Sequence, residues 1–129
     1  MERYSGGMSS FRTLKAWQHA KILAIECVRA AKAFPKEEQY ALAAQLRRAV
    51  YSVALNIAEG SGRHGAREGR RFFDMARASL NEVEAILELA KGLEYIPLTT
   101  MARLEARRDE TAKTLFGLLR SISKAATAA

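Results

Sequence analysis

The sequence of 129 residues has one cysteine, two prolines and eight glycines, and each low count excludes a class of protein. The single cysteine, Cys27, rules out an internal disulfide and a cysteine-based zinc site within one chain. So few prolines and glycines do not supply the turns of a sandwich of many short strands. No apolar run approaches the roughly 20 residues that a membrane-spanning helix needs. We therefore expect a soluble protein.

The residue types that are abundant favour a helical domain with a basic surface. Hydrophobic residues make up 49% of the chain, which excludes a disordered polyelectrolyte, and a chain of this length corresponds to one domain. Alanine, leucine, glutamate and arginine are abundant, and all four favour helices. The formal net charge of +7 favours acidic partners such as nucleic acid or an anionic membrane surface.

Apolar residues recur at steps of three and four in four segments, which predicts four amphipathic helices. The predicted helices span about residues 13–33, from 36–39 to 60, 67–91, and from 99–100 to 124. Pro35 stops the first helix, Gly60-Ser61-Gly62 ends the second in a left-handed cap, and Gly92 ends the third. No segment has the alternation of a strand.

Short loops between long helices place sequence neighbours antiparallel. We therefore predict an all-α, antiparallel up-down-up-down four-helix bundle over residues 13–124, with a flexible N-terminal tail over 1–12 and a C-terminal tail over 125–129. The N-terminal residues lack the apolar core of a secretory signal, and a lone reduced cysteine fits the cytoplasm, which is the expected location.

The predicted core is formed by the inward-facing residues of the four helices. They are Leu14, Trp17, Ala20, Ala24, Val28 and Ala31 in the first, Leu42, Leu46, Ala49, Val50, Val53 and Ile57 in the second, Phe72, Ala76, Leu80, Val83, Leu87 and Ala90 in the third, and Leu104, Thr111, Leu115, Leu118 and Ile122 in the fourth. Leu23 and Cys27 widen the apolar arc of the first helix beyond a single stripe.

The second helix carries an additional apolar stripe, which is formed by Tyr40, Ala44, Tyr51, Leu55 and Ala58. A helix that is apolar on two sides must be covered on two sides. Splayed packing within the bundle or another subunit can cover this stripe, and we favour self-association. The expected anchors of the interface are Tyr51 and Leu55.

A polar face on the same helix can be either a binding surface or a hydrogen-bond network between helices. It consists of Gln45, Arg48, Ser52, Asn56 and Glu59, with Ser79 and Glu82 as matching groups on the third helix. We favour the structural network, because buried polar groups must find partners.

An arginine cluster follows the glycine turn. Its members are Arg63, Arg67, Arg70, Arg71 and Arg77. Arg67 and Arg71 share one face of the third helix, and Arg70 and Arg77 share another, an arrangement that suits phosphate contacts. Pairing with the protein's own acids is the alternative. The sequence has no recognition-helix motif and no evident platform of exposed aromatic residues, so nucleic-acid binding would depend little on base sequence.

The residue types required for catalysis are scarce. His19 and His64 are the only histidines and lie on different elements, and no Glu-x-x-His pair of a di-iron bundle occurs. The Gly60-Ser61-Gly62 segment lacks the lysine of a phosphate-binding loop, and Ser79 has no histidine at an activating spacing. We predict no enzymatic activity, no cofactor, no metal, no small-molecule substrate and no membrane partner.

Four short motifs make the sequence similar to a known family. They are Phe34-Pro35-Lys36-Glu37-Glu38, Gln45-Leu46-Arg47-Arg48-Ala49, Asn56-Ile57-Ala58-Glu59-Gly60-Ser61-Gly62-Arg63 and Ala76-Arg77-Ala78-Ser79-Leu80-Asn81-Glu82. Over residues 14–96 the chain resembles the four-helix-bundle proteins encoded in intervening sequences of bacterial 23S rRNA genes, formerly labelled S23 ribosomal protein.

The resemblance implies a homo-oligomer, typically a ring of five bundles, without established enzymatic activity. A related bundle assists diversity-generating retroelements by binding nucleic acid and a reverse transcriptase. Three positions depart from the family pattern. Ala54 replaces a frequent proline, Ala78 replaces a usual glycine, and Gly69 stands where a larger residue is commoner.

Together these observations predict a non-enzymatic homo-oligomer that binds RNA or DNA through a basic surface with little sequence specificity. The alternative is a scaffold whose ring presents surfaces to a protein partner.

Overall fold

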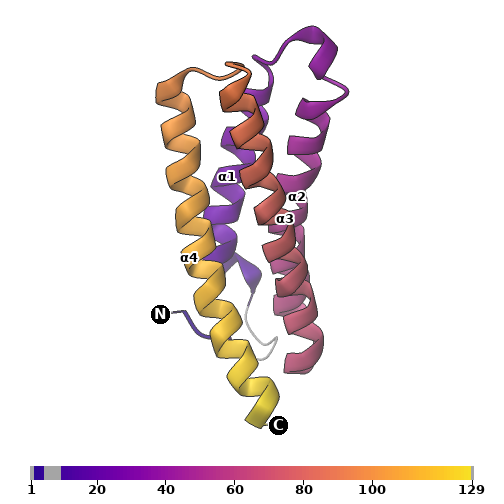
Figure 1. Cartoon of the computed structure of the whole chain (residues 1–129). Helices are drawn as coiled ribbons and strands as arrows, with labels where there is room; N and C mark the ends of the chain where they lie inside the picture. Colours follow the sequence, from indigo (N-terminus) through magenta and orange to yellow (C-terminus); the bar gives the residue numbers. More distant parts are fainter. Residues whose placement is uncertain (1, 5–9, 129) are drawn as a thin grey trace.

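The computed structural model describes residues 2–4 and 10–128, and it consists of four long helices (Figure 1). They are α1 (Lys15–Ala31), α2 (Leu42–Gly62), α3 (Ala66–Gly92) and α4 (Leu98–Ala128), with short 3-10 helices η1 (Phe11–Thr13) and η2 (Lys36–Glu38) before α1 and α2. The described residues contain no strand. The predicted all-α class is confirmed.

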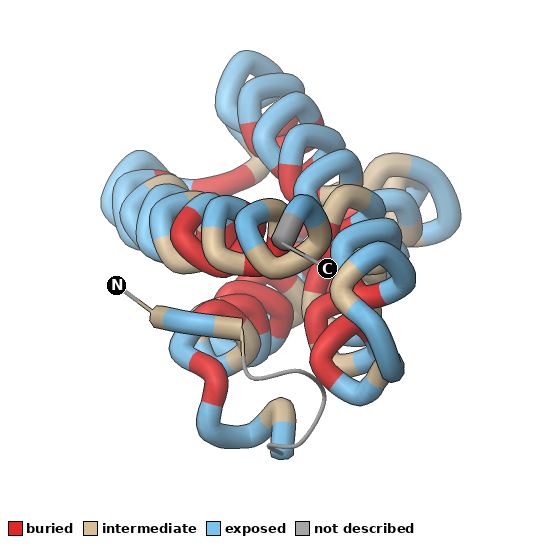
Figure 2. The backbone as a smooth tube through the Cα atoms, turned by 90° about the horizontal axis from the view of Figure 1, so that it is seen from below, coloured by how far each residue is buried: buried red, intermediate tan, exposed pale blue. Residues whose placement is uncertain are grey.

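Each long helix packs against two others, so the four helices stand at the corners of a square. Contacts join α1 to α2, α2 to α3, α3 to α4, and α4 back to α1. Figure 1 shows the chain running alternately up and down along these helices, and Figure 2 shows that the buried residues face the common interior. None of the described helices is long and apolar enough to cross a membrane.

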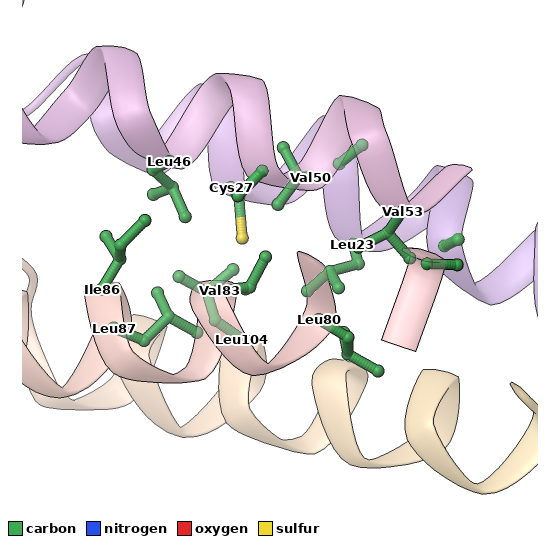
Figure 3. Close-up of a cluster of buried hydrophobic side chains, with 14 of the residues drawn as sticks. Leu23, Cys27, Leu46, Val50, Val53, Leu80, Val83, Ile86, Leu87 and Leu104 are labelled. Carbon is green, nitrogen blue, oxygen red and sulfur yellow. The ribbon is translucent and has the colours of Figure 1, made fainter. Parts of the chain in front are cut away.

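All five predicted core residues of α4 are buried, and so are those of α2 apart from the half-buried Leu42. Trp17 and Val28 of α1 are also half-buried, and α3 needs one correction. Phe73 is fully buried, whereas Phe72, the predicted core residue, is half-buried at the surface. Phe73 lies three residues before Ala76 and seven before Leu80, which places it on their buried face. On α1, Leu23 and Cys27 lie at the centre of the core (Figure 3), so the extra width of its apolar arc is covered within the bundle.

Burial of Cys27 predicts a loss of stability at alkaline pH. Burial raises the pKa of the Cys27 thiol from 9.0 to about 12. The unfolded chain therefore loses this proton near pH 9, whereas the folded chain keeps it until about pH 12. Between these values the free energy of unfolding should fall by about 1.4 kcal/mol per pH unit from this group alone.

Urea unfolding at pH 8, 9, 10 and 11 measures this effect, with Cys27→Ala as the reference. The stability difference between wild type and Cys27→Ala should shift in favour of the variant as the pH rises above 9. A pH-independent difference would contradict the burial of this thiol.

The glycines at the end of α2 do not form the left-handed cap that the sequence predicted. The α2 helix continues through Gly62, and the described residues with a positive φ are Gly65, just before α3, and Glu94, after α3. Gly60 instead allows a close approach of two helices. Gly60 and Gly69 meet where α2 crosses α3, and a Cβ atom on either one would lie 2.9 Å from the other's carbonyl oxygen. Gly60 is therefore required for packing inside the helix.

The N-terminal residues that the structure describes pack against the bundle. The Glu2 carboxylate accepts hydrogen bonds from the backbone N–H groups of Lys15 and Ala16, and so caps α1, where Leu14 has no side-chain acceptor. The backbone N–H of Tyr4 donates to Ser121 on α4 over 3.0 Å. The predicted flexible tail falls partly on residues 1 and 5–9, which lie outside the described residues. At the other end, α4 continues through 125–128.

Candidate nucleic-acid interface

The arginine cluster lies on the outer surface of the bundle, at the α2–α3 connection and along the first half of α3. Arg63 caps α2, and the other four arginines are exposed residues of α3. Within this helix Arg67 and Arg71 lie one turn apart on one face, and Arg70 and Arg77 lie two turns apart on another.

Arg63 is held by contacts within the chain. Its guanidinium donates to the Glu59 carboxylate over 2.5 Å and stacks on the Phe72 ring, 4.5 Å from the centroid. Arg71 approaches the same ring at 5.6 Å. These contacts explain why Phe72 lies outside the core, and they leave Arg63 less available to a ligand than the other arginines.

Three of the remaining arginines pair only loosely with acids on their own helix. Asp74 lies 3.7 Å from Arg70 and 3.6 Å from Arg77, and Glu68 lies 3.9 Å from Arg71. All these side chains are at least two-fifths exposed, and such pairs contribute little to stability. Intramolecular pairing is therefore present, but it leaves the guanidinium groups accessible.

The acidic second half of α3 does not neutralise the arginine cluster. Glu84 in this half pairs with Arg108 of α4 instead, at 2.7 Å. Lys91 in this half likewise pairs across to Glu105 of α4, at 3.6 Å. These two ion pairs therefore join the second half of α3 to α4 and not to the arginine cluster.

A basic groove runs between α3 and the C-terminal half of α4. The groove residues are Arg70, Asp74, Arg77, Phe116, Leu119, Arg120, Ser123 and Lys124. Four of them are cationic and one is a carboxylate, which leaves a strong positive excess. Arg3 of the N-terminal segment lies beside Arg120 and Lys124 at the end of this groove and adds another cation.

Sequence reasoning found only the α3 side of this groove. Phe116, Arg120 and Lys124 recur at four-residue steps on α4, a spacing that places them on one face and could have indicated a basic stripe. The sequence shows no evident platform of exposed aromatic residues, but the structure exposes one aromatic ring beside these cations. Phe116 is 59% exposed, and the Arg120 guanidinium lies 5.9 Å from its ring centroid.

The polar face of α2 forms a smaller network than predicted. The Ser52 and Ser79 hydroxyls are 2.7 Å apart across the α2–α3 contact, and the Asn56 amide donates to the Ser52 hydroxyl over 3.0 Å. Gln45, Arg48 and Glu82 are exposed and lie outside this network, and Glu59 pairs with Arg63. The network is small because only the residues that face α3 are removed from water.

The additional apolar stripe of α2 is open to solvent in the isolated chain. The predicted place of Tyr40 on this helix is wrong, because α2 begins at Leu42 and Tyr40 lies in the turn before it, 95% exposed. On the helix itself Leu55 is 67% and Tyr51 46% exposed, while Ala44 and Ala58 are half-buried. Packing within this one bundle therefore does not cover the stripe. Ile22 and Ile25 are the exposed apolar residues that α1 contributes to the surface.

The structure does not assemble the histidines into a site. His19 lies on α1 with Nδ1 3.3 Å from an Arg107 nitrogen, and His64 is exposed in the α2–α3 connection. Within residues 2–4 and 10–128, no group of three His, Cys, Asp or Glu side chains is placed to hold a metal ion.

The fold and surface define a class of protein, a basic four-helix bundle with an uncovered apolar stripe on one helix. The family model of the 23S rRNA-intervening sequence protein matches residues 12–117, and the chain belongs to this family. The resemblance read from the four motifs is thereby confirmed. No significant match to a curated protein is found.

Proposed function

We propose that this protein is a non-enzymatic homo-oligomer that binds nucleic acid through the basic groove between α3 and α4. The groove itself is the main support for this proposal. It gathers Arg70, Arg77, Arg120 and Lys124 from two helices around the single carboxylate of Asp74. Phosphate recognition needs a concentration of positive charge rather than a fixed donor pattern, so this surface suits a polyanion of any sequence.

One groove offers few phosphate contacts, and self-association would multiply them. The exposed stripe formed by Tyr40, Ala44, Tyr51, Leu55 and Ala58 is the proposed interface between copies. A ring repeats the groove once per subunit and converts weak contacts into avidity along one strand. We propose a pentamer, the assembly that the family resemblance implies.

The two faces of α3 supply a test of the groove with a matched control. Arg70→Gln with Arg77→Gln removes two charges inside the groove, and Arg67→Gln with Arg71→Gln removes two charges outside it. Fluorescence anisotropy at about 50 mM salt should show a loss of affinity of about tenfold or more for the first pair. The second pair should lose much less. The first pair should also make the fall of log affinity with log salt less steep, by about 1 to 2 in the slope.

Equal losses from the two pairs would mean that the ligand senses the overall charge rather than the groove. Absence of binding to any RNA or DNA at low salt would overturn the proposal and favour the scaffold alternative, in which the oligomer presents its surfaces to a protein partner. Sedimentation of each variant confirms that the assembly is unchanged.

A further inference from the structure

We infer that the groove binds single-stranded nucleic acid, and that Phe116 stacks on an unpaired base. This inference rests on the proposed function and narrows its ligand class. The residues that carry it are Phe116, Arg120 and Leu119 on α4 and the two groove arginines of α3, Arg70 and Arg77.

Phe116 is the central observation. The residue is 59% exposed, although it lines a groove whose other large side chains are mostly charged. An aromatic face gains nothing from a phosphate group. It gains stacking energy from a base, and every base has such a face, so the contact is tolerant of sequence.

Arg120 supports the same ligand. Its guanidinium lies 5.9 Å from the Phe116 centroid, one helical turn further along α4. A guanidinium over the ring covers part of one face, so a base would stack on the exposed remainder of the ring, with the positive charge close to the adjacent phosphate. Leu119, which is buried, forms an apolar floor beside them.

The cations on the opposite wall fit the backbone of the same strand. Arg70 and Arg77 are separated by two helical turns on α3, and both lie within 3.7 Å of Asp74 on the same wall of the groove. A strand lying in the groove would place its phosphates against α3 and its bases against α4. A duplex keeps its base faces stacked on one another, so Phe116 would remain unused.

The binding test compares three probes of the same mixed sequence, about 20 nucleotides long: single-stranded RNA, single-stranded DNA and duplex DNA. The full-length chain should bind the single strands about tenfold more tightly than the duplex. Phe116→Leu keeps the apolar volume but removes the aromatic face. It should weaken single-strand binding about tenfold and leave duplex binding unchanged. Leu89→Ala, which alters an α3 leucine of similar exposure (57%), is the control and should change neither.

Photocrosslinking provides a readout that is independent of affinity. A single strand carrying 5-iodouracil should crosslink to the peptide containing Phe116, and Phe116→Leu should abolish that product. Equal affinity for single strands and duplex, with no effect of Phe116→Leu, would overturn this inference and leave the proposed function intact. A change of oligomeric state in Phe116→Leu would also overturn it, because Phe116 would then belong to the subunit interface. Absence of all binding would overturn both.

Discussion

Replacing Gly60 by alanine is expected to destabilise the bundle by about 2 to 3 kcal/mol, whereas the same replacement at Gly62 should be neutral or stabilising. A Cβ atom on Gly60 would lie 2.6 Å from Cε1 of Phe73 and 2.9 Å from the carbonyl oxygen of Gly69. Both separations are far shorter than van der Waals contact, and the oxygen belongs to the backbone of α3, so the two helices must move apart. A Cβ atom on Gly62 would meet nothing within 4 Å.

Urea unfolding at one fixed protein concentration measures this prediction, since assembly makes stability depend on concentration. Gly62→Ala should raise the free energy of unfolding by up to about 1 kcal/mol, because it removes backbone freedom from the unfolded chain. Gly69→Ala should behave like Gly60→Ala, since its Cβ atom would lie 2.8 Å from Cδ1 of Ile122 and 2.9 Å from the Gly60 oxygen. Wild-type stability in Gly60→Ala would contradict the close crossing of α2 and α3.

Replacing Tyr51 and Leu55 together by glutamate is expected to dissociate the proposed oligomer. The two side chains lie one helical turn apart on α2 and are 46% and 67% exposed in the single chain. If a second copy covers them, the double variant places two carboxylates in an apolar interface. The subunit affinity should then fall by more than about 100-fold. Analytical ultracentrifugation at micromolar concentration measures the mass of the assembly.

A pair of leucines at the C-terminal end of α3, Leu89 in the helix and Leu93 at its C-cap, provides the matched control. Leu89 and Leu93 are also one helical turn apart and are 57% and 51% exposed, but they lie outside the α2 stripe. Their replacement by glutamate should leave the assembly unchanged. If the wild type sediments as a monomer, or if the control pair dissociates the oligomer as well, the α2 stripe is not the interface.

Much of the fold could be predicted from local patterns. On α2 and α4 the buried apolar residues recur at steps of three and four along the chain. This periodicity alone identifies the buried face of each helix. Phe72 and Phe73 show where this reasoning stops. Two adjacent phenylalanines are equally suited to the core by sequence. Which of them is buried depends on which one contacts a neighbouring helix and which one contacts an arginine.

Only the α3 side of the candidate site could be predicted from the sequence. The arginines of α3 stand out because they are close together in the sequence. Arg120 and Lys124 are remote from them in the chain, and they join the same groove only because α4 packs beside α3. The exposed ring of Phe116 was missed for a related reason, since exposure depends on how far the neighbouring helix reaches.

The sequence by itself determined the helical class, the four segments and the family, because these depend on periodicity, helix propensity and short motifs along the chain. Tertiary structure decided the role of Gly60, which sequence reasoning assigned to a helix cap and which serves the crossing with Gly69. It also decided which cations share a surface. Both outcomes depend on distances between helices, and a one-dimensional pattern carries no information on the separation of two backbones that are remote in the chain.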